Sequence, residues 1–377
     1  MKKFVIAIAF LMLIGFFVRH LSAENAPIHP QELADNAALR YWLAFAAMPQ
    51  YSKEQQELVS ANWRTAPIDE KVVVIVQQGE PCLDLLKRAA ELQTCDWGLV
   101  WEGPKTLMPQ LAKGRELAKL AALRMRYRCS QGDGTGAVTD AVDILTLARH
   151  LQSDGLLISV LVGQAVEQNV ITAATTDLAR LDGTSLQKLL ASLDTLPPAK
   201  RTGEVLLAEK QYMLDWQIDQ LKKSGVRAYE AMLKDAQGSG LPLSEKPTQE
   251  AVDQLVRQLE GSAALYVEWA KMATLPPEEY ERKLKEAEEH LKKDNPFVPM
   301  FIPGAIAGRY NEGRAEATIA MFRAAIRIVL DNPKEVVVPL DAQKKPLFEY
   351  HKTENGFDLT STAFFRGTHV KLSVLGK

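Results

Sequence analysis

Two acidic and two indole side chains lie close together in a segment of the chain that lacks helical periodicity. Asp96, Trp97, Trp101 and Glu102 fall within residues 94–106, which read Thr-Cys-Asp-Trp-Gly-Leu-Val-Trp-Glu-Gly-Pro-Lys-Thr. Long loops on rigid helical frameworks often carry binding residues, and the amphipathic indole suits recognition surfaces. A carboxylate flanked by tryptophan can also acquire the raised pKa that a general acid requires. These four residues form the candidate binding site of the sequence.

The same four residues also have a purely structural interpretation. The tryptophans can fill a gap between helices while Asp96 caps a turn, because a long loop usually needs an apolar anchor of its own. This structural role is the more common one for such a loop. The sequence alone leaves both interpretations open.

A second group of residues is basic. Arg124, Arg126 and Arg128 alternate with Met125 and Tyr127 near the end of an expected helix. Such a cluster could bind phosphate or an anionic surface. Basic residues near the C-terminal end of a helix also complement the helix dipole, and we favour that interpretation.

Signatures of catalysis and of metal binding are missing from the sequence. It contains no His-Glu-x-x-His, no Gly-x-Ser-x-Gly and no phosphate-binding loop. The glycine-rich stretch 132–136 joins two expected helices and follows no strand. We therefore expect no catalytic residue, metal site or cofactor.

The first 23 residues indicate export. Lys2 and Lys3 precede an apolar run of 15 residues, 4–18, and Ala23 offers a small residue for cleavage. This run is shorter than the roughly 20 residues of a permanent membrane-spanning helix. Because Leu21 is larger than the residue preferred there, an uncleaved anchor is the alternative. We expect a signal peptide at 1–23 and a periplasmic or secreted protein, with membrane contact only through this segment if it stays uncleaved.

Charge and cysteine content limit which ligands and which disulfide bonds we expect. The chain has 45 Lys and Arg against 47 Asp and Glu, and removal of residues 1–23 leaves 42 basic residues and a net charge of −5. This balance argues against a general nucleic-acid binder. Cys82, Cys95 and Cys129 allow at most one intramolecular disulfide. Three reduced thiols are favoured, and a bridge is left open.

Helical periodicity recurs along most of the chain. It predicts a mainly α protein of tandem antiparallel helices, a helical-hairpin array followed by a small β tail. Helices are expected at residues 31–48, 52–63, 68–78, 81–93, 107–129, 155–181, 184–194, 198–223, 225–236, 248–273, 277–293 and 304–331, with another around 138–148. Residues 24–331 are thus an all-helical domain with a subdivision possible at the linker-like stretch 237–247. Ser52 and Gln55 are typical of a capping box, and the prolines at 296, 299 and 303 indicate a loop before the last helix. The stretch 155–166 is apolar nearly all round, which favours a buried central helix over a membrane span.

The tail, residues 332–377, changes to a strand pattern. Two β-rich stretches, 347–351 and 357–361, flank a turn at Asn355-Gly356, and residues 369–375 are expected to add a third strand.

Three stretches of the chain carry a resemblance to known proteins: the stretch from Asn36, Cys95-Asp-Trp-Gly, and the Gly-Asp turn with the helix that follows it. They resemble a family of uncharacterised exported helical proteins found in Planctomycetes-type bacteria. The resemblance covers most of residues 36–235. It implies export and a helical fold, and no activity is known for the family. Residues 118–151 are similar to one tetratricopeptide hairpin, and the tail is similar to the end of bacterial pseudopilins.

These observations favour a non-catalytic binding or scaffold protein of the cell envelope, with a protein or peptide partner and no nucleic acid. One alternative is a carboxylate-dependent enzyme of the envelope, glycan hydrolase-like, that uses Asp96 and Glu102. Another is a component of a secretion or pilus-like assembly, suggested by the tail.

Overall fold

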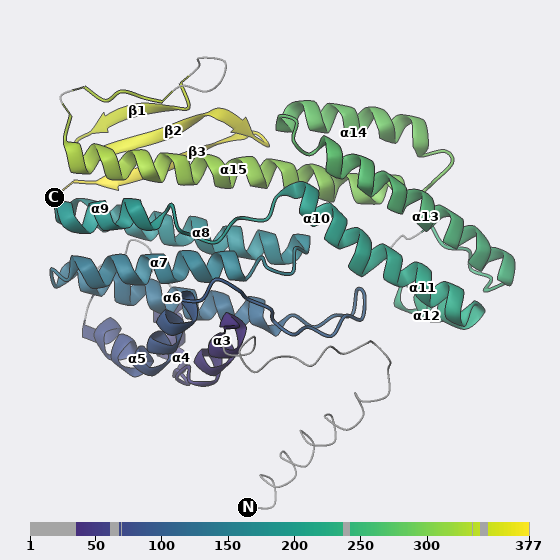
Figure 1. Ribbon diagram of the computed structural model, residues 1–377, viewed down its shortest axis with the longest axis horizontal. Coiled ribbons are helices and arrows are strands. Elements are labelled where there is room, and N and C mark those ends of the chain that lie inside the picture. The colour runs from purple at the N-terminus through teal and green to yellow at the C-terminus, as the bar shows by residue number, and fades with distance from the viewer. Residues whose placement is uncertain are drawn as a thin grey trace, which may run out of the picture.

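The structure is a computed structural model that describes residues 35–60, 68, 70–236, 242–333, 335–339 and 346–376. The expected signal peptide lies outside the described residues, as does part of the linker candidate 237–247. The fold class is as predicted: helices make up most of the chain and a three-stranded antiparallel sheet ends it (Figure 1).

Three helices form one flank of the molecule. They are α3 (Ala37–Ala46), α4 (Lys53–Ser60) and α5 (Glu70–Ala90). The Asn36 side chain caps α3 by accepting a hydrogen bond from the Ala38 amide. The capping box expected at α4 is present, because the Ser52 amide donates to Gln55 and the Gln55 amide donates to the Ser52 hydroxyl.

Pro81 does not begin a helix, contrary to the sequence prediction of two helices over 68–93. It lies inside α5, which continues unbroken to Ala90. An interior proline costs about 3 kcal/mol in a helix. Burial of Val76, Cys82 and Leu83 on both sides of it within the core offsets that cost.

Helices α6 (Pro109–Ser130), α7 (Gly134–His150) and α8 (Leu157–Asp177) follow as consecutive hairpins and lie side by side (Figure 1). The turn between α6 and α7 is short because Gly132 adopts φ of 78° and the Asp133 side chain caps α7. Helix α9 (Gly183–Ser192) completes this layer.

Helix α8 is the central element. Together with residues 178–180 it is long and apolar enough to cross a membrane by length and composition alone. In the fold it packs against α6, α7, α15 and β3. An apolar helix enclosed on several sides is a core helix, in line with the sequence interpretation.

A second group of helices extends from this core. Helix α10 (Thr202–Glu209), a π-helical turn (Lys210–Asp215) and α11 (Trp216–Ser224) follow one another without a break, and the run begins four residues later than predicted. Helices α12 (Val226–Asp235) and α13 (Gln249–Met272) pack around them, and α14 (Pro277–Leu291) packs on α15.

The long helix α15 (Val298–Asp331) runs back across the core (Figure 1). Residues 298–303 belong to it, although Pro299 and Pro303 led the sequence analysis to a loop there. Pro299 falls in the first turn, where its missing N–H costs nothing. Burial of Ile302, Ala305 and Ile306 holds the next turn helical.

The C-terminal sheet has the order β1-β2-β3, with strands Phe348–Thr353, Gly356–Phe365 and Thr368–Leu375. Glu354 and Asn355 form the first turn, and Gly356 already pairs with Thr353, so the turn is one residue earlier than predicted. Strands β2 and β3 pack on α15, and β3 also packs on α8. The described residues 335–339 form no strand.

Close packing of α7 against α8 depends on Gly163. A Cβ atom there would lie against the Ala148 carbonyl oxygen, nearer than such atoms approach in proteins. We expect Gly163→Ala to lower the free energy of unfolding by about 1–3 kcal/mol, since the two helix backbones must separate. Chemical denaturation measures the effect.

The matched control is Gly261→Ala in α13, where the new Cβ would meet nothing nearer than 3.5 Å. Helix propensity alone then predicts a gain of up to about 1 kcal/mol. Equal effects of the two substitutions would contradict the close packing.

Candidate functional site

Trp97 of the sequence-predicted site is a core residue with 4% of its surface exposed. Its ring stacks on Tyr41 and Phe45 at centroid distances of 5.5 and 6.1 Å, and meets Trp42 edge-on. Its Nε1–H donates to the His150 carbonyl oxygen at 2.9 Å. Trp97 therefore fastens the loop to α3 and α7.

Asp96 closes a turn. Its backbone amide donates to Asn36 Oδ1 at 2.9 Å, and Asn36 Nδ2 donates back to its carbonyl oxygen at 2.8 Å. The Asp96 carboxylate accepts from the Gly98 amide at 3.0 Å. These contacts match the structural interpretation of this residue.

The other two predicted site residues face a different neighbour. Trp101 is half-buried and stacks on Tyr212 at a centroid distance of 4.1 Å. Glu102 is exposed, and its amide donates to the Thr106 hydroxyl at 2.9 Å. The four side chains thus have separate surroundings, and the indoles join the loop to two parts of the helical body.

Truncation of Trp97 and of Trp101 should lower the free energy of unfolding by different amounts. We expect Trp97→Ala to lower the free energy of unfolding by about 3–5 kcal/mol, because a buried ring is lost. Trp101→Ala removes a half-buried stacked ring and should cost about 1–2 kcal/mol. Urea denaturation of both variants tests this order, and the reverse order would contradict the anchoring role of Trp97.

The arginine cluster of α6 faces inward. Arg124 is 2% exposed and pairs with Asp140 and Glu80, each at 2.7 Å. Arg126 pairs with Asp177 at 3.0 Å. The Arg124 and Arg126 charges therefore join α6 to α5, α7 and α8, and neither charge lies on a surface that could bind an anion.

Asp143 lies beside this network without a full set of partners. It is 6% exposed, and its Oδ2 atom accepts no hydrogen bond within the described part of the chain. Burial, with repulsion from Asp140, raises the pKa of Asp143 to about 7 against the attraction of Arg124.

This raised pKa predicts a pH dependence of stability. Between about pH 4 and 7 the native state binds a proton at Asp143 that the unfolded chain releases, so the free energy of unfolding falls as pH rises through that window. Asp143→Asn should remove this fall and make the protein more stable than wild type above pH 7. Urea titrations at pH 5 and pH 8 measure it, with Asp84→Asn at an exposed position as control. A gain that is the same at both pH values would contradict the assignment.

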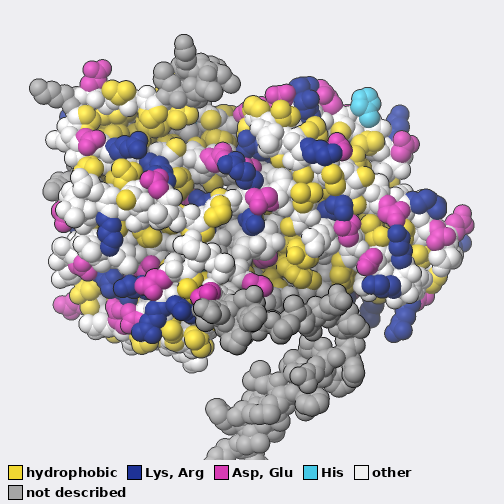
Figure 2. Space-filling view, in the orientation of Figure 1, with side chains coloured by type: hydrophobic (Ala, Val, Ile, Leu, Met, Phe, Trp, Pro, Cys, Tyr) yellow, Lys and Arg dark blue, Asp and Glu magenta, His cyan; other side chains and the backbone are white. Residues whose placement is uncertain are grey.

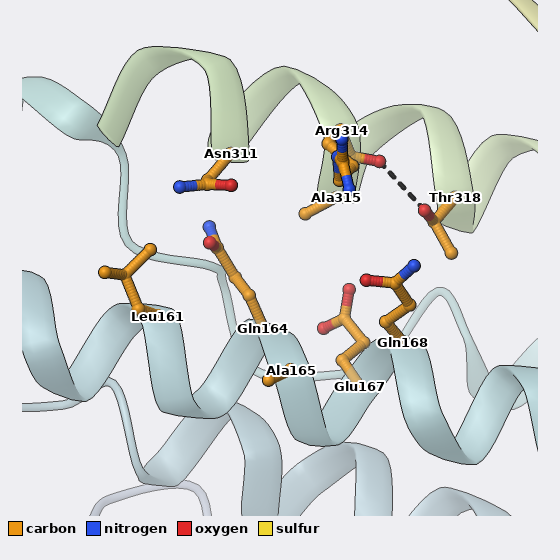
Figure 3. Close-up of a pocket in the computed structure, with 9 residues that line it drawn as sticks. All are labelled: Leu161, Gln164, Ala165, Glu167, Gln168, Asn311, Arg314, Ala315 and Thr318. Atoms are coloured by element: carbon orange, nitrogen blue, oxygen red, sulfur yellow. Dashed lines mark hydrogen bonds between the residues drawn. The ribbon is translucent and has the colours of Figure 1, made fainter. Parts of the chain in front are cut away.

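A cleft opens between α8, the segment 193–201 and α15. It consists of a small pocket of about 120 Å³ and a neighbouring groove of about 460 Å³. Gln164 and Ala315 line both, so the two adjoin. Figure 3 shows the small pocket, in which side chains of α8 rise toward α15.

The floor of the cleft is a buried ion pair. Arg149 Nε of α7 lies 2.9 Å from Glu167 Oε2 of α8, and their side chains are 11% and 2% exposed. Burial raises the pKa of Glu167, and Arg149 opposes that shift. The described residues donate no hydrogen bond to Glu167 Oε2. In Figure 3 the Glu167 carboxylate stands in the pocket between Gln164 and Gln168.

Side-chain amides surround this carboxylate. Gln164, Gln168 and Asn311 all line the small pocket. The Gln164 Oε1 atom is buried and accepts no hydrogen bond from the described residues. An amide offers a donor and an acceptor, so this group can pair with an incoming polar chain.

The groove combines apolar and charged walls. Leu193, Leu196 and Ile319 supply apolar surface. Glu312 accepts hydrogen bonds from the Thr202 amide and hydroxyl, at 3.0 and 2.6 Å, and so fastens α10 to α15. Charged side chains of both signs line the groove: Arg149, Lys200, Arg201, Arg323, Glu312 and Glu316. Figure 2 shows the same interspersed pattern over one face of the molecule.

The three cysteines are free, and burial raises the pKa of the Cys82 thiol to about 11 and of Cys129 to about 12. They therefore stay protonated at neutral pH. Within the described residues no group of three or more His, Cys, Asp or Glu side chains is placed to hold a metal ion.

Comparison of the chain with protein-family models, with curated proteins and with solved structures finds no match. The sequence analysis missed the cleft, although one signal was available: Glu167 is a lone acid in the apolar stretch 155–173, and such a group needs a partner or a ligand.

Proposed function

We propose that this chain is an exported cell-envelope protein that binds an extended segment of a partner protein in the cleft between α8 and α15. The observation that carries the proposal is that the small pocket and the larger groove adjoin at Gln164 and Ala315. Buried polar atoms of their lining residues, among them Gln164 Oε1 and Glu167 Oε2, have no hydrogen-bond partner among the described residues.

The chemistry of the lining suits a peptide. Side-chain amides such as Gln164 and Asn311 carry the same donor and acceptor groups as a peptide backbone. The apolar wall of the groove accommodates side chains of the bound segment, and charges of both signs would select its sequence. An extended segment could occupy both the pocket and the groove at once.

The envelope-enzyme alternative receives less support. Hydrolysis of a glycan would need two carboxylates facing each other across the cleft. Glu312 lines the groove, but both of its carboxylate oxygens have partners. One oxygen accepts hydrogen bonds from Thr202, and the other pairs with Arg201. Asp96 and Glu102 have separate neighbours in the loop and are not among the residues that line this cleft.

Export, the resemblance to exported proteins of Planctomycetes-type bacteria and the envelope location remain parts of this proposal. The pilus-like alternative rests on the tail. Because β2 and β3 pack against α15 and α8, the sheet supports the helices that form the cleft walls. This packing favours a role for the tail inside the protein.

Filling the cleft tests the proposal. Ala315 lines both the pocket and the groove and is half-buried, so Ala315→Trp should obstruct the junction. We expect affinity capture with crosslinking from the native envelope to recover one partner with wild type, and the recovery to fall at least about tenfold in the variant.

Ala112→Trp is the matched control, because Ala112 is exposed on α6 and lines neither part of the cleft. Circular dichroism establishes that both variants fold. Undiminished capture by a folded Ala315→Trp protein, or recovery of no partner by wild type, would overturn the assignment.

A further inference from the structure

Two buried oxygen atoms of residues that line the small pocket, Glu167 Oε2 and Gln164 Oε1, accept no hydrogen bond from the described residues. We propose that this pocket accepts a primary ammonium group of the bound partner, contributed by a lysine side chain or by a free amino terminus, with Glu167 as its counter-ion. This inference rests on the proposed binding function and names the group that the cleft recognises.

The acceptors of the pocket come from separate elements. Glu167 stands in it as an almost fully buried carboxylate whose Oε2 receives no hydrogen bond from the described residues. The buried Gln164 oxygen is also without a donor. Asn311 of α15 lies opposite, with its amide facing Gln164 in Figure 3. An ammonium has three N–H donors and no acceptor, so it complements this set.

The cation that lines the pocket, Arg314, makes its hydrogen bonds to the tail sheet. Its Nη2 donates to the Thr368 hydroxyl at 2.7 Å and to the Phe365 carbonyl oxygen at 3.3 Å. The Thr318 hydroxyl donates to the Arg314 carbonyl oxygen at 2.9 Å. The Arg314 bonds join α15 to the tail sheet, and the Thr318 bond lies within α15. Neither residue donates a hydrogen bond to Glu167 Oε2 or Gln164 Oε1.

Arg149 alone does not satisfy Glu167. The pair is close, at 2.9 Å, yet neither Arg149 Nε nor Glu167 Oε2 has a partner in hydrogen-bonding geometry. Leaving a buried charged acceptor without a hydrogen bond is costly. A ligand ammonium that enters the pocket would donate a hydrogen bond to Glu167. Binding of the ligand would therefore supply the hydrogen bond that the buried carboxylate lacks.

Three short peptides probe the group directly. They are tetra-alanine amide with a free amino terminus, an acetylated and amidated peptide of three alanines and a lysine, and acetylated tetra-alanine amide without an amine. Calorimetric titration of the full chain should show one amine peptide binding at least about tenfold, or about 1.4 kcal/mol, more tightly than the acetylated peptide. The amine that binds identifies the source of the ammonium.

The role of the Glu167 carboxylate is tested with a double variant that removes both buried charges. Replacing a buried ion pair by neutral groups of similar volume usually preserves folding, so Glu167→Gln with Arg149→Met is the main test. It should abolish the preference for amines. Glu57→Gln, at an exposed position of α4 that lines neither part of the cleft, should leave the preference unchanged.

Equal binding of the amine and acetylated peptides by wild type, no measurable binding of either amine peptide at millimolar concentration, or a preference that persists in the folded double variant would each overturn the inference. Envelope capture separates this failure from failure of the proposed function. A partner that is lost with Ala315→Trp but retained by the double variant would leave the binding cleft intact and disprove the ammonium site.

Discussion

Enclosure of α8 is the constraint on which the rest of the structure depends. This helix is apolar along most of its length and exposes little of its surface, so it must be covered on several sides. Helices α6 and α7 cover one side, and α15 and β3 cover another. Gly163 lets α7 approach at backbone distance, and the C-terminal sheet holds α15 in place. The cleft lies where α15 does not close completely over α8.

Charge burial follows from the same arrangement. Since α6, α7 and α8 are packed on more than one face, polar residues on them must find partners inside the protein. Arg124 pairs with Asp140 in this way, and Arg126 pairs with Asp177. Arg149 and Glu167 form a pair that opens to the cleft and is incompletely hydrogen bonded. A satisfied pair serves the fold, whereas an incompletely satisfied pair beside a cavity suits recognition of a ligand.

In the loop before α6, residue types that often occur in binding sites have a structural role. Trp97 fills the space among Tyr41, Trp42 and Phe45, and Trp101 stacks on the distant Tyr212. The loop thereby joins the N-terminal helices to the π-helical turn. Its conspicuous composition reflects the apolar anchors that a long irregular segment needs, which was the structural interpretation offered by the sequence.

The sequence by itself determined the helical class, most helix positions, the Ser52 capping box and the strands of the tail, because these follow from local periodicity and capping chemistry. It failed at Pro81 and Pro303, where core burial outweighed a local signal. Only the tertiary structure decided which charges pair and where the cleft lies. Arg149, Glu167 and Asn311 come from three helices, and no local pattern relates positions whose distance depends on how those helices pack.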